Sequence, residues 1–310
     1  MLVPFPAILD GGLATELERT HGKSLRSHLW SAQCLKEDPD AIRQTHLSYF
    51  RAGADVATTC TYQATEEGFL RAGYGTHEVQ MLMQRGVDIA REAREIYLKE
   101  GPSNSRDLSV VFSSGCYGAF LANGTEYTGE YGAVTVEGLM DFHRRRIQMV
   151  SGHDAIAFET IPSLQEAEAL ARLARTEAIG PAWITFACKD TKSLNDGNSL
   201  REAAQMFASI PNIFGVGVNC TKPRWIYALL REVDSVIPRE KRLVAYPNAG
   251  EEWNSLAGKW QDETAAGCEV FGEMASQLFD EFGGRVMVGG CCRTGPEHIS
   301  CIRNHLREKI

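Results

Sequence analysis

No apolar run in the 310-residue sequence approaches the roughly 18 residues that a membrane-spanning helix needs, which excludes an integral membrane protein of that type. Basic residues are not in excess either. The chain has 32 Lys and Arg against 40 Asp and Glu, a formal net charge of −8, whereas nucleic-acid-binding domains are usually strongly basic. We therefore expect neither a membrane nor a nucleic acid as a partner.

Features of an export signal are also missing. Residues 1–6 contain no basic side chain, and Asp10 follows too soon for a signal peptide. We therefore expect a cytoplasmic protein whose nine cysteines lie in a reducing compartment. Nine is an odd number, so complete internal disulfide pairing is excluded.

Motifs for phosphate-bearing cofactors are absent or incomplete. The sequence has no phosphate-binding loop ending in Lys followed by Ser or Thr. Residues 215–220 begin like a dinucleotide fingerprint, but the third glycine is missing, and alternating glycines in a barrel strand more often permit close packing. Because no Pro- or Ser-rich linker interrupts the chain, we predict a single domain over residues 1–310.

What the sequence does contain is a regular alternation of short apolar runs and longer segments of helical periodicity. Runs that are apolar throughout are typical of parallel strands buried on both faces, and their alternation with helices indicates α/β architecture. Eight such units favour one closed (β/α)8 barrel of TIM type, with enlarged loops at 116–132 after the third strand and at 249–262 after the seventh. The strands are predicted at 7–9, 55–59, 109–112, 155–158, 183–186, 214–218, 243–246 and 286–288, and the helices at 40–52, 77–100, 135–151, 164–177, 199–209, 223–236, 263–283 and 296–308.

Polar, acidic and thiol side chains are concentrated where the predicted strands end. Catalytic groups of such barrels lie at the carboxyl ends of the strands, so these residues are expected to converge on one face. In chain order they are Asp10, Gly11 and Gly12, then Thr59–Tyr62, Glu159 and Thr160, Asn219 and Cys220, Tyr246–Asn248, and finally Cys291 and Cys292.

The adjacent thiols Cys291 and Cys292 are the sharpest feature. Neighbouring strand residues point to opposite faces, so both thiols can face one point only where the chain leaves strand geometry, which Gly289 and Gly290 allow. Together with Cys220, their spacing is too long for a zinc finger but suits a reactive zinc centre with three thiolates and one open position. On spacing alone, packing or redox roles remain open, including a strained disulfide between the two neighbours.

Other polar residues are predicted to have ordinary structural roles. Free cysteines are usually buried as small hydrophobic residues, which we expect of Cys34, Cys188, Cys268 and Cys301. The run Arg144–Arg146 is expected on a solvated helix face. His21, His28 and His46 lack the spacing of metal ligands and are expected to be surface or hydrogen-bonded residues.

Six stretches, in order, resemble the homocysteine S-methyltransferases, and most of all the stand-alone enzymes that use S-methylmethionine. The similarity extends from about residue 7 to residue 303, and the Asn-Cys pair followed by Gly-Gly-Cys-Cys is its most specific part. The stretches are 9–17, 61–65, 158–162, 217–220, 246–251 and 289–294. One departure is Cys116, which stands where the family usually has proline, so a rigid turn on the donor side is lost.

The resemblance implies a (β/α)8 fold and zinc-dependent methyl transfer from a sulfonium donor to the thiol of homocysteine, which gives methionine. It assigns Cys220, Cys291 and Cys292 as zinc ligands that activate the substrate thiol. The implied substrate pocket combines Glu159 for the ammonium group, the backbone N–H groups of the turn Asp10, Gly11 and Gly12 for the carboxylate, and Asn248 beside the open metal position. Aromatic faces suited to a sulfonium are Tyr62, Tyr117, Tyr127, Tyr131 and Trp253.

Several alternatives remain open at this stage. The donor is S-methylmethionine, S-adenosylmethionine or betaine, and the acceptor is homocysteine, selenocysteine or another thiol or selenol. A barrel aldolase or phosphate-ester enzyme would instead bind phosphate after the last two strands, and a non-catalytic zinc- or thiol-sensing barrel would keep the metal without the reaction. The sequence does not decide between a monomer and a homo-oligomer.

Overall fold

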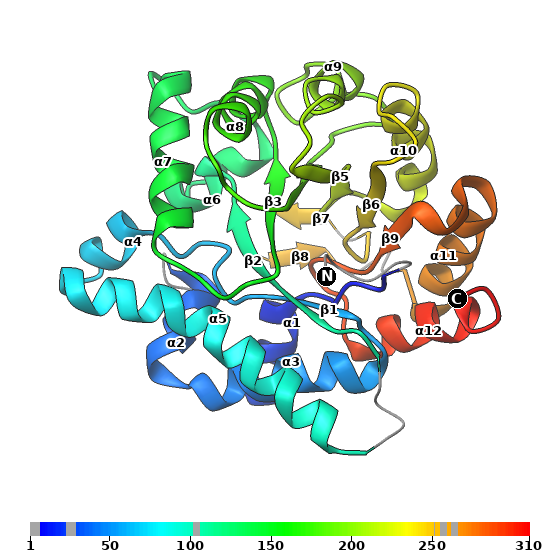
Figure 1. Ribbon diagram of the computed structural model, residues 1–310, viewed down its shortest axis with the longest axis horizontal. Helices are drawn as coiled ribbons and strands as arrows, with labels where there is room; N and C mark the ends of the chain where they lie inside the picture. The colour runs from blue at the N-terminus through cyan, green and yellow to red at the C-terminus, as the bar shows by residue number, and fades with distance from the viewer. Residues whose placement is uncertain (1–6, 23–28, 102–105, 251, 255–258, 262–265) are drawn as a thin grey trace.

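The computed structural model describes residues 7–22, 29–101, 106–250, 252–254, 259–261 and 266–310. Seven parallel strands form one curled sheet in the order β1-β2-β3-β4-β5-β6-β9, and helices surround it on the outside (Figure 1). A separate antiparallel hairpin, β7-β8, lies in the long connection between β6 and β9. Within the described residues, no helix combines the length and the apolarity needed to cross a bilayer.

The element boundaries follow the sequence pattern closely. The sheet strands are β1 (Val56–Thr58), β2 (Ser109–Gly115), β3 (Ala155–Ile161), β4 (Ala182–Phe186), β5 (Ile213–Asn219), β6 (Arg242–Tyr246) and β9 (Val286–Val288), and the hairpin strands are β7 (Glu252–Asn254) and β8 (Lys259–Gln261). The helices are α1 (Leu13–His21), α2 (Cys34–Glu37), α3 (Pro39–Ala52), α4 (Glu66–Arg71), α5 (Thr76–Lys99), α6 (Tyr117–Leu121), α7 (Val136–Gln148), α8 (Leu164–Thr176), α9 (Leu200–Gln205), α10 (Ile226–Asp234), α11 (Cys268–Phe282) and α12 (Pro296–Leu306).

The predicted α/β class with a parallel sheet is confirmed, but the closed eight-stranded barrel is not found in that form. The segment expected as the first strand, 7–9, makes only two isolated parallel bridges, Ile8 with Val288 of β9 and Leu9 with Val56 of β1. The N–H of Ile8 donates to the side chain of Asp55 (2.9 Å) instead of to a neighbouring strand. A regular ladder therefore does not develop, although this segment touches both edge strands of the sheet.

Two apolar clusters hold the architecture together. The larger one lies between the sheet and the surrounding helices. The smaller one is enclosed by the curled sheet and combines Ala7, Leu9, Val56, Val111, Ala155, Ala157, Trp183, Val244, Tyr246 and Met287, with Phe214 and Cys291 packed against it. A filled interior of this kind is typical of TIM-type sheets and leaves room for chemistry only at the strand ends.

The glycines of β5 serve close packing, as the sequence suggested. A β-carbon on Gly215 would lie 2.9 Å from a side-chain carbon of Val244, and one on Gly217 would overlap the backbone of the same residue.

We therefore expect Gly217→Ala to lower the free energy of unfolding by roughly 3 kcal/mol, because backbone atoms cannot move aside. Urea unfolding measures the effect. Gly75→Ala, at the start of α5 with open space around it, should change stability by less than about 1 kcal/mol.

Two long connections leave the carboxyl ends of β2 and β6, where the sequence predicted enlarged loops. The connection after β2 contains α6 and the short 3₁₀ turn Thr125–Tyr127 before α7 begins. The connection after β6 contains the β7-β8 hairpin and ends at α11. Both follow the strand ends that carry the predicted reactive residues.

Candidate metal centre and substrate pocket

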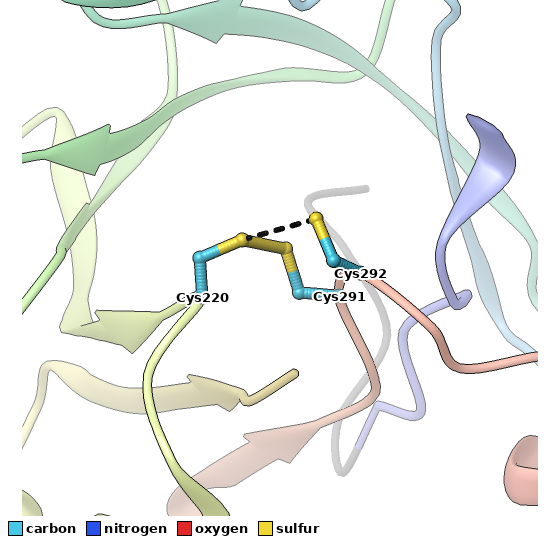
Figure 2. Close-up of side chains that lie close together, drawn as sticks. All are labelled: Cys220, Cys291 and Cys292. Atoms are coloured by element: carbon cyan, nitrogen blue, oxygen red, sulfur yellow. Dashed lines mark hydrogen bonds between the residues drawn. A yellow bond between two sulfur atoms is a disulfide. The ribbon is translucent and has the colours of Figure 1, made fainter. Parts of the chain in front are cut away.

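Three thiols from two distant parts of the chain meet at one end of the sheet (Figure 2). Cys220 directly follows β5, and Cys291 and Cys292 lie just beyond β9. Their sulfur atoms all lie within 4.8 Å of one another. Cys220 and Cys291 are paired as a disulfide, and the sulfur of Cys292 is 3.7 Å from that of Cys220. The convergence expected from the sequence is therefore present, and the pair formed is not the strained pair of neighbours.

The backbone places these thiols by leaving strand geometry. β9 ends at Val288, and the N–H of Cys291 then donates to the carbonyl of Pro247 after β6 (2.7 Å). Gly289 and Gly290 are needed for close approach, since β-carbons there would overlap Leu9 and Thr294. Cys220 itself has a positive φ of 48°, an uncommon conformation for a side-chain-bearing residue and one that often marks functional sites.

The chemistry of the three thiols suits a bound cation. Burial, together with the charges of Glu126 and Glu159, raises the pKa of Cys292 to about 12. This thiol is therefore protonated near neutral pH unless a positive charge stabilises its thiolate. Once the Cys220–Cys291 pair is reduced, the three sulfur atoms could hold one metal ion.

Asn219, the last residue of β5, connects Thr160 of β3 with Cys291, a role that the sequence did not reveal. Its side-chain oxygen accepts from the N–H of Thr160 (2.7 Å), and its amide donates to the hydroxyl of Thr160 (2.8 Å) and approaches the sulfur of Cys291 (3.9 Å). These bonds hold Thr160 at φ 62°, beside a register shift in β3. Irregular strand geometry of this kind re-aims neighbouring side chains, here including Glu159.

Two buried carboxylates lie close to the thiols. Glu159 of β3 accepts hydrogen bonds from the hydroxyls of Ser113 and Tyr246. Asp10 accepts from the N–H of Thr58 (2.8 Å) and from its hydroxyl (2.9 Å). Burial raises the pKa of Glu159, and burial together with the charge of Glu159 raises the pKa of Asp10 to about 8. Two buried acidic groups whose pKa values are raised by burial favour binding of a positively charged group.

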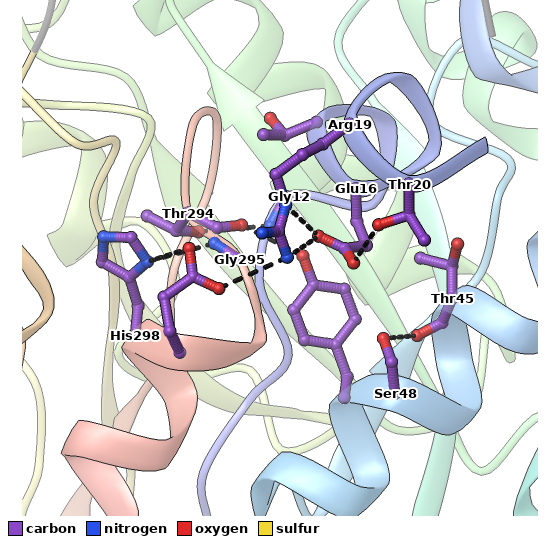
Figure 3. Close-up of polar contacts among 12 residues, drawn as sticks. Gly12, Glu16, Arg19, Thr20, Thr45, Ser48, Thr294, Gly295 and His298 are labelled. Carbon is purple, nitrogen blue, oxygen red and sulfur yellow. Dashed lines mark hydrogen bonds and ion pairs between the residues drawn. The ribbon is translucent and has the colours of Figure 1, made fainter. Parts of the chain in front are cut away.

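The turn after residues 7–9 needs one correction. We predicted that its N–H groups are open to a carboxylate, but the N–H of Gly12 donates to the carbonyl of Thr294 (2.9 Å), as Figure 3 illustrates. That carbonyl also accepts from the hydroxyl of Tyr49. No acceptor for the N–H of Gly11 is found in the described part of the chain. A β-carbon on Gly12 would lie 2.5 Å from the carbonyl oxygen of Cys291, so this turn borders the thiols directly.

The first turn of α1 lies beside the same thiols. The N-cap residue that precedes it, Gly12, has no side chain to cap the free N–H groups of the helix. Within the helix, Glu16 accepts from Arg19 (2.8 Å) and Thr20 (2.6 Å), and Arg19 also reaches Glu297 of α12 (Figure 3). The positive dipole end of α1 therefore lies beside the backbone of Cys291.

Tyr62 lies in the loop after β1 and is half-buried, with its hydroxyl bonded to Thr160. Its carbonyl accepts from the guanidinium of Arg146 (2.9 Å), which also binds the carbonyls of Thr61 (2.9 Å) and Gly115 (2.6 Å). The prediction that Arg146 lies on a solvated helix face is wrong, since it is 2% exposed. It follows Phe142 by four residues on the buried face of α7, a periodicity that could have identified it.

Asn248 lies after β6, as predicted, and is half-buried. Its N–H donates to the carbonyl of Thr221 (3.1 Å), and its side-chain oxygen accepts from the N–H of Gly250 (2.9 Å). The residue therefore forms a local turn that joins the loops after β5 and β6. The next residue, Ala249, donates its N–H to the carbonyl of Cys292 (3.1 Å), so this loop borders the segment that carries the thiols.

The aromatic residues of the loop after β2 have two different roles. Tyr131 packs against Tyr117 (5.4 Å between ring centres) and donates to the buried carboxylate of Glu166 (2.6 Å), which also accepts from the N–H of Tyr117. These two tyrosines therefore connect the loop after β2 to α8. Tyr127 is half-exposed, and Cys292 contributes to its raised pKa after burial, which places it near the thiols. The side chain of Trp253 lies outside the described residues.

Cys116 preserves the geometry that a proline would impose. It begins α6 with φ −66° and ψ 166°, values that proline also adopts. Its side chain is fully buried. The turn after β2 therefore has a backbone conformation that proline also allows at this position.

Comparison with known proteins gives a consistent result. A family model described as homocysteine S-methyltransferase matches residues 7–306. Homocysteine S-methyltransferase 4 of Zea mays is 42% identical over 311 residues, which covers 97% of this chain and 90% of the relative. Selenocysteine Se-methyltransferase of Brassica oleracea var. italica is 42% identical over 312 residues, covering 97% and 88%. The metallated form of the homocysteine methyltransferase MmuM from Escherichia coli is similar with a TM-score of 0.81 and 36% identity, covering 96% of this chain and 95% of that one.

Proposed function

The chain belongs to the homocysteine S-methyltransferase family, and from that premise we propose that it transfers a methyl group from a sulfonium donor, S-methylmethionine, to the thiol of homocysteine. The observation that carries this proposal is the meeting of three cysteine sulfurs, two of them on adjacent residues, within 4.8 Å at the carboxyl ends of the strands. With this donor both products are methionine.

We propose zinc as the resident metal. The related MmuM structure is described as metallated, and three thiolates with one free position are the ligand set of a reactive zinc centre. Bound by Cys220, Cys291 and Cys292, zinc would lower the pKa of the homocysteine thiol from about 8.5, so that the nucleophilic thiolate is present at neutral pH. Loading requires reduction of the Cys220–Cys291 disulfide, because a thiol engaged in a disulfide is no longer a thiolate ligand.

The amino-acid part of homocysteine is bound beside the thiols. Glu159 and Asp10 hold its ammonium group, and the positive charge would draw both carboxyl groups into their ionised form. The N–H of Gly11 and the uncapped N-terminus of α1 hold its carboxylate, since helix N-termini favour anions. Asn248, in the loop after β6, would contact the entering thiol. These contacts fix the orientation of the nucleophile, a contribution that reaches about 7–11 kcal/mol in well-oriented reactions.

The donor approaches from the loop after β2. Its sulfonium is positive, and it meets a region made negative by the thiolates and in part by Glu126, whose pKa burial raises to about 7. Tyr62 and Tyr127 offer aromatic faces, each worth about 0.5–2 kcal/mol as a cation–π contact. Attack in line on the methyl carbon neutralises both charges, so a site that excludes water favours the reaction.

We also propose that the sheet functions as one TIM-type barrel domain closed by residues 7–9. The bridges from Ile8 to β9 and from Leu9 to β1 support closure at this point. Closure matters for function because the N–H of Gly290 donates to the carbonyl of Asp10 (3.0 Å). That bond ties the ammonium-binding turn to the segment that carries Cys291.

A second acceptor deserves testing beside homocysteine. The selenocysteine methyltransferase of Brassica oleracea is as similar to this chain as the homocysteine enzymes are. Selenocysteine is one methylene shorter than homocysteine, so the distance from the ammonium-binding carboxylates to the metal position would decide between them.

The proposal is tested with reduced protein loaded with zinc. We expect methionine to form from homocysteine with S-methylmethionine, more slowly with S-adenosylmethionine and not with betaine. Removal of zinc with a chelator should abolish turnover, and zinc should restore it. Selenocysteine in place of homocysteine measures the acceptor preference as a ratio of kcat/KM values. Full activity of zinc-free protein, or no product with any of the three donors, would overturn the proposal.

A further inference from the structure

A second group of sulfur, oxygen and nitrogen atoms that could bind a metal lies between α11 and α12, the helices before and after β9. Cys268 and Glu269 are the first two residues of α11, and Cys301 lies on α12, which packs against α11 (Figure 1). The sulfur atoms of both cysteines and a carboxylate oxygen of Glu269 all lie within 4.8 Å of one another. The prediction that Cys268 and Cys301 are buried packing residues is wrong, because both are partly exposed and face each other across the helix pair.

His305 lies beside this group and is in contact with Glu269. It lies one helical turn after Cys301, and its Nδ1 is 3.0 Å from the carbonyl of that residue. In the tautomer whose Nδ1–H donates to this carbonyl, Nε2 carries no proton and its lone pair is free to bind a metal. Nε2 lies 3.7 Å from the carboxylate of Glu269. A histidine ligand is usually oriented in this way, with one nitrogen bonded to a carbonyl and the other turned to the metal.

The packing leaves room for this ring. A β-carbon on Gly272, one turn after Cys268, would overlap the imidazole of His305. Any larger residue would push the ring off the surface of α11 and away from Glu269. Gly272 therefore leaves the space in which His305 lies beside Glu269.

We propose that Cys268, Glu269, Cys301 and His305 form a second binding site for a thiophilic divalent cation, zinc by its ligand chemistry. Two sulfurs, one imidazole nitrogen and one carboxylate oxygen are a four-ligand set, and a site closed by four protein ligands is structural. The cation would fasten the first turn of α11, where the long connection from β6 ends, to the C-terminal helix α12. This site is independent of the proposed catalytic reaction.

The test is to count zinc ions in reduced, fully folded protein dialysed against a low, buffered concentration of free zinc. We expect two ions per chain in the unchanged protein, one in Cys301→Ser, one in Cys291→Ser and none in the double variant. Methyl transfer by Cys301→Ser should be unchanged. Zinc should also raise the Tm of Cys291→Ser, which keeps only the second site, and should not raise the Tm of the double variant.

Glu269→Gln provides a second variant at an exposed position, where folding is not at risk. It should weaken zinc binding at the second site by on the order of 10–100-fold. Glu273→Gln removes the same charge one turn further along α11 and should leave the affinity unchanged. Equal zinc content in the unchanged protein and in Cys301→Ser would overturn the second site. Loss of zinc from Cys301→Ser but not from Cys291→Ser would instead contradict only the proposed catalytic centre.

Discussion

Cys291→Ser is expected to lose both the bound metal and the methyl transfer activity. A hydroxyl does not ionise at neutral pH, so the variant keeps at most two sulfur ligands for the cation. Without the metal the homocysteine thiol stays mostly protonated and loses its fixed orientation beside Glu159. We expect kcat to fall by on the order of 10²–10³-fold or more, the scale of losing an oriented electrostatic contact.

Metal analysis and single-turnover formation of methionine measure the two losses separately. Cys60→Ser is the matched control: the thiol of Cys60 is buried and donates to the carbonyl of Ser31 (3.1 Å), a bond that serine can also make. This control should keep its zinc and its turnover. A Cys291→Ser protein that still binds one ion at the first site with full activity would remove Cys291 from the catalytic centre.

The sequence predicted the elements well where burial and periodicity agree. Strand segments such as 155–158 and helix segments such as 164–177 are found within a few residues of their predicted bounds, as β3 and α8. Residues 7–9 were harder, because their register depends on Asp55, whose side chain takes the N–H of Ile8. A side chain that accepts a backbone hydrogen bond in place of a neighbouring strand does not change the hydropathy pattern, so the pattern cannot predict it.

The site shows the same division. The convergence of Cys220 with Cys291 follows from strand ends and could be predicted, because parallel strands place their carboxyl ends at one edge. The engagement of the Gly12 N–H by Thr294 could not, since the partner is far away in the sequence. Arg146 was misread because a run of three arginines suggests solvent, while the helical phase of the third one turns it inward.

Glu159→Gln is expected to raise the KM for homocysteine about 10–100-fold with a smaller change in kcat. The variant keeps the shape of the side chain but removes the charge that faces the substrate ammonium, and a hydrogen bond between charged groups is worth about 1.5–3 kcal/mol. Steady-state kinetics measures the effect. Glu130→Gln, at an exposed position in the loop after β2, is the control and should leave KM unchanged.

The pH dependence of KM makes this prediction specific to Glu159. Burial raises the pKa of its carboxyl group, although Ser113, Tyr246 and the charge of Arg146 oppose the shift. As the pH falls through this raised pKa, protonation removes the partner of the ammonium group, so KM rises toward acid and levels off at higher pH. Asp10, with a pKa of about 8 in the free protein, adds a second rise in the same direction. In Glu159→Gln only the Asp10 part should remain, and a variant with the unchanged pH profile and an unchanged KM would place the ammonium group elsewhere.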